Sequence, residues 1–233
     1  CLFCCGTYFF SRFFWKDSTR NILAFLAGTW NNGYFGLPVA LILFGENILG
    51  AYVLALFASI LYENTIGFFI VNRAEYRPRE SLFRMLRLPT VYAFVLGLAF
   101  NAWGIELGGQ YDVIASSFRW TYTILGMMII GVALAWDNKK AFDPIFVGTT
   151  FFIKFFLWPV IVLFVIFVDK HYLWILSEEG YQVLVLFSIV PLAAKTVALA
   201  SLCNAQPEKA SLAVLWSTVF AVIYIPLFIA FFL

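Results

Sequence analysis

Long apolar runs restrict the folds open to this chain more than any other feature. The run "FFIKFFLWPVIVLFVIFV" covers residues 151–168, and similar runs recur along the sequence. A helix that spans a bilayer needs about 20 mostly apolar residues. Of the 233 residues, 63% are hydrophobic and 12% are charged, and that charge fraction is about half the usual value for a soluble domain. A transmembrane β-barrel would alternate apolar and polar residues, and these runs do not alternate. The sequence therefore predicts an all-α polytopic membrane protein.

Polar interruptions divide the chain into eight candidate spans. The first is short and looks like the surviving end of a helix, and the sequence begins with Cys rather than Met. We therefore expect the chain to be the remainder of a longer protein that is truncated at its N-terminus. The predicted spans are residues 2–15, 21–44, 48–71, 89–103, 111–136, 144–168, 181–203 and 210–233.

Basic residues are concentrated in alternate loops between these spans. Counting from the loop after the first span, one side holds eleven lysines and arginines, and the opposite side holds only Lys170. Cytoplasmic loops carry the excess of Lys and Arg in membrane proteins. We therefore expect the basic loops to be cytoplasmic and the C-terminus to lie outside, in a multi-pass protein of the plasma membrane. The eleven are Arg12, Lys16, Arg20, Arg73, Arg77, Arg79, Arg84, Arg87, Lys139, Lys140 and Lys209.

The second span is interrupted by the polar stretch "TWNNGYFGLP" at residues 29–38. Its flanking arms, residues 21–30 and 39–44, are each too short to cross a bilayer. An additional crossing at this point would also reverse the side of every later loop and abolish the charge asymmetry. We therefore interpret the stretch as a break inside one span.

The seventh span carries a comparable interruption, because Pro191 lies near its centre and Lys195 follows one turn later. Proline removes a backbone donor and breaks or kinks a helix. Pro38 and Pro191 are 153 positions apart, and the same shift brings the end of the sixth span onto the end of the first. This spacing predicts two five-helix repeats in opposite orientation, with two helices missing from the first. Residues 1–72 then end the first repeat, 73–88 form a basic cytoplasmic linker, and 89–233 form the second repeat. Inverted repeats with broken helices are typical of secondary transporters.

The stretch "NNGYFGLPVALILFGENILGAY" resembles the fourth helix of the auxin efflux carrier family, through Asn31, Gly36, Leu37, Pro38, Phe44 and Gly45. "LPTVYAFVLGLAFNAWGIEL" and "GMMIIGVALA" are similar to the sixth helix and to the end of the seventh. "IVPLAAKTVALASLCNAQPEKASLAVLWSTVFAVIYIPL" is similar to the ninth and tenth. The resemblance implies a ten-helix inverted-repeat fold in which helices four and nine cross at their breaks. It also implies a site for an organic anion beside the crossing.

The candidate site residues are polar groups or helix-breaking residues near the two interruptions. Half-helix N-termini expose free N–H groups that suit a carboxylate. A lysine near the bilayer centre, such as Lys195, is costly and indicates function; it could pair with the substrate, pair with Glu63, or replace a coupling cation. The asparagines could instead only satisfy the freed backbone, and Lys154 could snorkel or contact a neighbouring helix. The predicted substrate-binding residues are Asn31, Asn32, Gly33, Gly36, Pro38, Pro191 and Lys195, and the coupling or ion-pair candidates are Glu63, Asn64 and Lys154.

The function predicted from these features is secondary transport, or facilitated passage, of a small organic anion by alternating access. The resemblance implies a malonate-like or auxin-like carboxylate. A non-transporting membrane sensor that binds a lipid or sterol in the same pocket is the alternative. Motifs of hydrolases, nucleotide-binding loops and paired CxxC ligands are missing from the sequence, so we expect no enzyme activity, no cofactor and no metal site. The net charge of +2 does not indicate a nucleic-acid partner, and a homodimer is left open.

Overall fold

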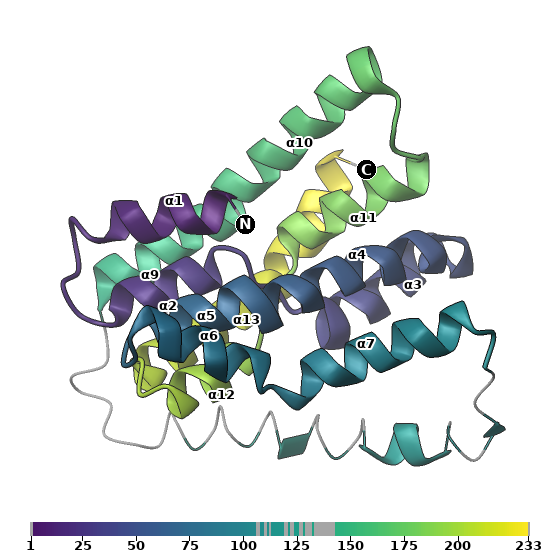
Figure 1. Ribbon diagram of the computed structural model, residues 1–233. Coiled ribbons are helices and arrows are strands. Elements are labelled where there is room, and N and C mark those ends of the chain that lie inside the picture. Colours follow the sequence, from purple (N-terminus) through teal and green to yellow (C-terminus); the bar gives the residue numbers. More distant parts are fainter. Residues whose placement is uncertain are drawn as a thin grey trace.

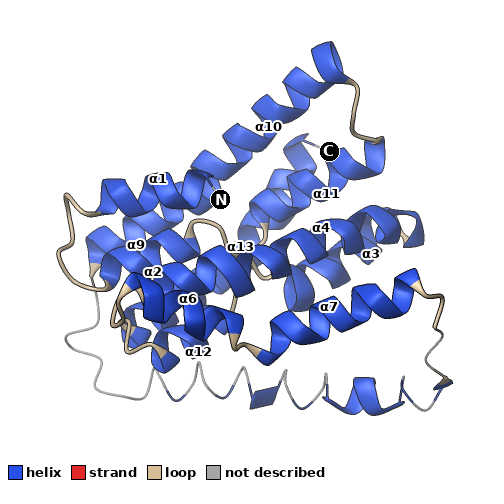
Figure 2. Ribbon diagram, viewed as in Figure 1, coloured by secondary structure: helices blue, strands red, loops and turns tan. Residues whose placement is uncertain are grey.

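The computed structural model describes residues 2–105, 108–109, 111, 113–118, 121, 124–125, 128, 132 and 143–232. Every named element in these residues is a helix, and Figure 2 shows no strand among them. The longer elements are α1 Leu2–Ser11, α2 Thr19–Leu26, α3 Leu37–Phe44, α4 Leu49–Tyr62, α5 Phe68–Asn72, α6 Pro78–Leu86, α7 Pro89–Ala102, α9 Pro144–Phe151, α10 Trp158–Val168, α11 Glu178–Ile189, α12 Lys195–Leu202 and α13 Pro207–Phe232. Five short turns join them: η1 Asn32–Gly36, η2 Glu46–Ile48, η3 Glu63–Gly67, η4 Phe152–Leu157 and η5 Asp169–Leu173.

The long apolar helices confirm a polytopic membrane protein. Among the described residues, three continuous stretches are long and apolar enough to cross a membrane: Glu46–Asn72, Pro144–Leu173 and Pro207–Phe231. The bent pair α6 and α7, with an angle of 46° between its helices, makes a fourth candidate. The three continuous stretches coincide with the predicted spans 48–71, 144–168 and 210–233 to within five residues, and α7 alone coincides with the span 89–103, whereas α6 lies in the predicted linker. Most of the predicted fifth span, 111–136, lies outside the described residues.

Both predicted interruptions are breaks between half-helices. α2 ends at Leu26, and the chain resumes as a helix only at Asn32, where η1 leads into α3. α11 ends at Ile189, and α12 begins at Lys195. α2 is surrounded by other helices, and all its residues from Ile22 to Leu26 are buried. The first break therefore lies inside the helix bundle (Figure 1).

The two prolines that led to the predicted repeat do not occupy equivalent places. Pro191 lies within the second break, whereas Pro38 lies in the first turn of α3, after the first break has ended. Proline is favoured at that place because the first turn of a helix has no partner for its N–H groups. The shift of 153 positions therefore does not superpose the two breaks, and the inverted repeat stays a prediction.

Two charged residues deep in the spans lie in π-helical turns. Glu63 begins η3, which interrupts the helix between α4 and α5, and Lys154 lies in η4, between α9 and α10. A π-turn inserts a residue into a helix and redirects the side chains around it, and such turns are frequent at functional sites. Both side chains are buried: Glu63 is 6% exposed and Lys154 is 1% exposed.

Three segments that carry predicted cytoplasmic residues meet at one end of the bundle. Lys209, at the start of α13, donates hydrogen bonds to Asp143 Oδ2 and to Thr19 Oγ1, each at 3.0 Å. Trp15 Nε1 donates to the same carboxylate at 3.1 Å, and Asp143 also caps α9 by accepting from the Phe146 N–H. Burial alone would raise the pKa of Asp143, but the hydrogen bonds from Phe146, Lys209 and Trp15 outweigh it and hold that pKa below its ordinary value.

Candidate functional site

The backbones of the two breaks are hydrogen-bonded to each other. The Asn31 N–H donates to the carbonyl of Pro191 at 2.8 Å, and Trp30 pairs with Leu192 in an isolated antiparallel bridge. The Leu192 N–H donates to Ser217 Oγ on α13 at 3.2 Å. Irregular backbone at membrane depth requires such partners because no water is available there. Each break therefore supplies backbone hydrogen-bond partners that the other needs, and the two broken spans are joined at this point.

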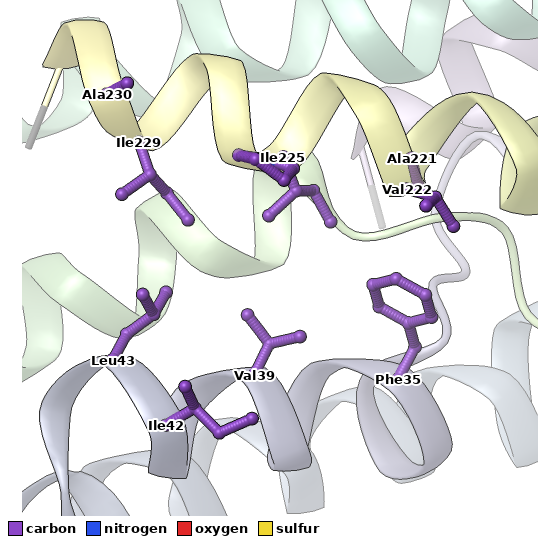
Figure 3. A pocket seen from close by; sticks show the side chains of 10 residues that line it. Phe35, Val39, Ile42, Leu43, Ala221, Val222, Ile225, Ile229 and Ala230 are labelled. Atoms are coloured by element: carbon purple, nitrogen blue, oxygen red, sulfur yellow. The ribbon is translucent and has the colours of Figure 1, made fainter.

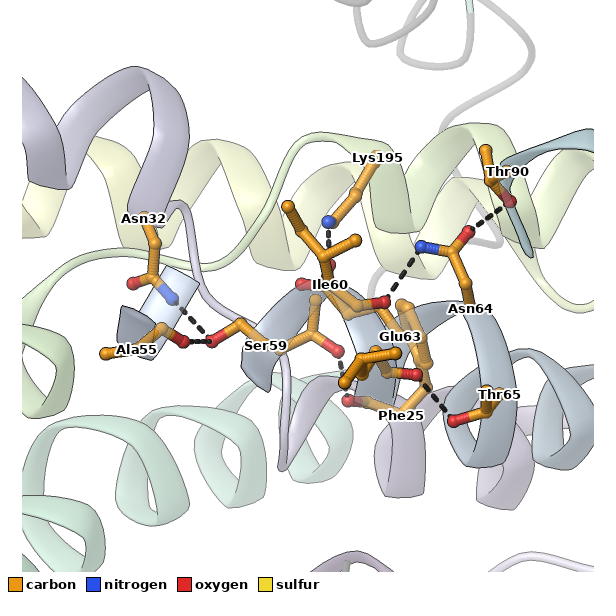
Figure 4. A network of polar contacts seen from close by, with 12 residues as sticks. Phe25, Asn32, Ala55, Ser59, Ile60, Glu63, Asn64, Thr65, Thr90 and Lys195 are labelled. Atoms are coloured by element: carbon orange, nitrogen blue, oxygen red, sulfur yellow. Dashed lines mark hydrogen bonds and ion pairs between the residues drawn. The ribbon is translucent and has the colours of Figure 1, made fainter. Parts of the chain in front are cut away.

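Asn32, the first residue after the first break, is held by two side chains of α4. Its carbonyl accepts a hydrogen bond from the Tyr52 hydroxyl at 2.6 Å, and its Nδ2 donates to Ser59 Oγ at 3.2 Å (Figure 4). The Asn32 side-chain oxygen is buried and has no partner. An unsatisfied buried polar atom costs about 1–3 kcal/mol. Asn32 therefore has free hydrogen-bonding capacity at the crossing.

Gly36 is required by the packing of Tyr52 against η1. A Cβ atom at residue 36 would collide with the Tyr52 hydroxyl. A Cβ atom at Gly33 would meet nothing within 4 Å, and Gly33 is exposed. Pro38 is also exposed, on α3. The structure thus places Gly36 at the crossing and leaves Gly33 and Pro38 on its outer side.

Lys195 and Glu63 form an ion pair beside the crossing (Figure 4). Lys195 begins α12, directly after the second break, and Glu63 begins η3 in the adjacent span. The Glu63 side chain is 5% exposed and that of Lys195 is 35% exposed. Of the three possibilities expected for Lys195, the pairing with Glu63 is present in the structure, and a role in binding the substrate or replacing a coupling cation stays a prediction. The carboxylate also lies near the N-terminal end of α12, where the helix dipole favours a negative charge.

Asn64 contacts α7 rather than the ion pair. Its Nδ2 donates to the Ile60 carbonyl at 2.8 Å, and its Oδ1 accepts from Thr90 Oγ1 at 2.9 Å. Phe57 and Phe94, whose ring centroids are 6.0 Å apart, form a second contact between α4 and α7. Asn64 therefore links the helix that carries Glu63 to the neighbouring helix α7.

Lys154 reaches the crossing from a different side and does not snorkel. Its Nζ donates to the Phe187 carbonyl in α11 at 2.8 Å and lies 4.6 Å from the centroid of the Trp30 ring. The predicted alternative in which Lys154 contacts a neighbouring helix is therefore the one observed.

Several site residues were not predicted from the sequence. Ser59 lies one turn before Glu63, so its position on the same helix face could have been inferred. Phe187 lies four positions before Pro191. Because proline has no N–H, the Phe187 carbonyl lacks its helical partner, and this could also have been inferred from the sequence. Tyr52 and Trp30 carry no local signal, because their roles depend on contacts between distant segments.

An apolar hollow between α3 and α13 is separate from these polar groups. A pocket of about 520 Å³ lies between α3 and α13, and Figure 3 shows Phe35 and Val39 on one wall with Ile225 and Ile229 on the other. All ten residues that line it are apolar. Because a carboxylate needs hydrogen-bond donors when buried, the pocket does not suit an anion, and the polar groups at the crossing do.

A model of the family described as "Membrane transport protein" matches residues 1–229. The chain therefore belongs to this family of membrane transport proteins, and the predicted resemblance to the auxin efflux carriers is confirmed. Neither the curated proteins nor the solved structures compared with the chain give a match.

Proposed function

We propose that this membrane transport protein carries a small organic carboxylate by secondary transport, with its substrate site at the crossed breaks. The ion pair of Lys195 and Glu63 beside the hydrogen-bonded breaks is the observation that carries this proposal. A buried ionisable pair at membrane depth is costly to maintain and indicates a functional site.

The pair offers a direct way to bind an anion. A carboxylate substrate competes with Glu63 for the Lys195 ammonium, and the N-terminal end of α12 stabilises whichever carboxylate lies there. Lys195 is the more accessible partner, with 35% of its side chain exposed, so the substrate approaches the cation from its exposed side and there competes with Glu63. Asn32 provides a second polar contact through its amide nitrogen, which carries two N–H groups and donates one of them to Ser59.

The way the site is assembled supports alternating access. Broken helices that meet at mid-membrane form the fixed centre about which one bundle moves against another in secondary transporters. Here α7 contacts the bundle through Thr90 on Asn64 and Phe94 on Phe57. We infer that these few contacts are the ones that change as α7 and the bundle move relative to each other.

The test is uptake of radiolabelled carboxylates into proteoliposomes that contain the full-length protein. We expect saturable uptake that an unlabelled carboxylate inhibits and an uncharged amide analogue does not. Lys195→Met should lower uptake at least tenfold, whereas Lys170→Met, at an exposed ion pair with Glu178, should transport like the parent. Absence of carboxylate flux from the parent, or full activity of Lys195→Met, would refute the proposed function or its site.

A further inference from the structure

Pro191 leaves a carbonyl in α11 without its helical partner. In a continuous helix the N–H of residue 191 would donate to the carbonyl of Phe187, four positions earlier. Proline has no N–H, and α11 accordingly ends at Ile189. The C-terminal end of a helix also carries a partial negative charge on its unpaired carbonyls. Because Phe187 is buried, this end of α11 needs a donor, and a positive charge suits it best.

Lys154 supplies that donor. Its Nζ donates to the Phe187 carbonyl oxygen at 2.8 Å. The same atom lies 4.6 Å from the Trp30 ring centroid, so it also makes a cation–π contact. Trp30 is part of the other break and pairs with Leu192. One side chain therefore touches both broken spans.

The position of Lys154 is built into the helix that carries it. The π-helical turn η4 redirects residues 152–157 within the span. The Trp30 ring is itself held edge-on by Trp158, with centroids 4.7 Å apart. Among the described residues, ion pairs are formed by Lys170, Lys195 and Lys209, and Lys154 has no carboxylate partner of this kind. Its charge is therefore balanced by the end of α11 and the face of Trp30.

In secondary transporters, unwound carbonyls and the C-terminal ends of half-helices are the places where coupling cations bind. We propose that Lys154 is a positioning residue that acts as a tethered cation at this place, so that anion transport through the crossing requires no sodium ion. The inference rests on the proposed function, since it concerns coupling at the same crossing. It assigns different tasks to the two lysines, because Lys195 faces Glu63 and the substrate, and Lys154 holds the broken helix end.

The first experiment measures uptake by the parent in sodium chloride and in choline chloride at equal concentration. We expect the same rate in both salts. A drop of tenfold or more in choline would overturn the proposal. A parent without any anion flux would refute the proposed function instead, and the second experiment would still decide the role of Lys154.

The second experiment follows thermal unfolding of the purified protein in choline, sodium and methylammonium chloride. Lys154→Ala should unfold at a lower temperature than the parent in choline, and sodium or methylammonium should restore at least half of the loss, because the cation enters the vacated place. The parent and Lys170→Ala should show the same midpoint in all three salts. A Lys154→Ala protein that responds to neither cation would overturn the proposal.

A third variant covers the case in which Lys154→Ala does not fold. Lys154→Met keeps the length of the side chain and removes its charge. We expect at least a tenfold loss of uptake, together with partial recovery in Lys154→Arg. Lys154→Met with parental uptake and parental stability would show that the charge has no role.

Discussion

Lys195 and Glu63 are ion-paired although 132 positions separate them in the chain. Lys195 is the first residue after the second break, and Glu63 is the first residue of the π-turn η3. Their contact joins the broken span of α11 and α12 to the continuous span that crosses the membrane beside it. In the proposed mechanism, a movement of α12 that admits the substrate therefore changes the partner of Glu63.

Removing both members of this pair should destabilise the protein by less than the sum of the two single removals. Glu63→Gln leaves the Lys195 ammonium without its partner, and we expect a loss of about 1–3 kcal/mol, at the lower end of the values for buried pairs because Lys195 is partly exposed. The double variant Glu63→Gln with Lys195→Met should lose less than the sum of the two single changes, by about 0.5–3 kcal/mol. Thermal unfolding of the four proteins in one detergent measures this coupling. Additive losses would contradict a direct interaction.

Gly36 and Tyr52 should show a coupling of steric origin. Gly36→Ala places a methyl group against the Tyr52 hydroxyl, and overpacking of this kind costs about 1–3 kcal/mol. Tyr52→Phe removes the hydroxyl and with it the hydrogen bond to the Asn32 carbonyl, at a cost of about 1–3 kcal/mol. In the double variant the clash is relieved, so its stability should exceed the value expected from the two separate losses. Gly33→Ala, at an open position, is the matched control and should be close to the parent.

Asn32 should affect transport more than stability. Its side-chain oxygen has no partner in the structure, so Asn32→Ala removes only the hydrogen bond to Ser59 from the fold. If the amide also binds the carboxylate, the variant loses a charge-assisted hydrogen bond of about 1.5–3 kcal/mol, which corresponds to roughly tenfold to hundredfold in affinity. Ser59→Ala breaks the same internal hydrogen bond without removing the amide. Equal effects of the two variants on the half-saturating substrate concentration would assign Asn32 a structural role only.

The course of the chain through the membrane could be predicted from the sequence because it depends on bulk properties. Apolar length determines where a span lies, and four predicted spans agree with the structure. The break at Pro191 was also predictable, because proline lacks a backbone N–H whatever the rest of the chain does. The equivalence of Pro38 and Pro191 was predicted wrongly, because proline suits the first turn of a helix as well as a break.

The contacts at the crossing could not be predicted, for a physical reason. Which residue of one break faces which residue of the other depends on how half-helices that are distant in sequence pack. The pairing of Trp30 with Leu192 and the contact of Tyr52 with Asn32 are of this kind. The pairing of Lys195 with Glu63 was one of three open alternatives, and its presence depends on the contact between α12 and η3.

Asp143 should make the stability of its end of the bundle, which is predicted to be cytoplasmic, depend on pH. Its pKa is lowered in the folded protein, so its contribution is fully present above the ordinary carboxyl value near 4 and is lost as the pH falls through the lowered pKa. Asp143→Asn keeps the cap of α9 but removes the charge that faces Lys209. We expect a loss of about 1 kcal/mol at pH 7 and a smaller difference from the parent near pH 3, measured by thermal unfolding. A difference that does not change with pH would show that the charge of Asp143 is not involved.

The orientation of the chain can be tested with single cysteines at the two ends of the bundle. The excess of basic residues near α6 predicts that Arg79 faces the cytoplasm, and His171, beyond α10, should face the outside. Both side chains are exposed. In a background in which all four cysteines are replaced by alanine, His171→Cys should react with a membrane-impermeant maleimide in intact cells. Arg79→Cys should react only after the cells are permeabilised, because the reagent cannot cross the membrane.

The opposite pattern of labelling would show that the chain has the reverse orientation with the same fold. Equal labelling of both positions in intact cells would place both on the outside and contradict the predicted number of crossings between them.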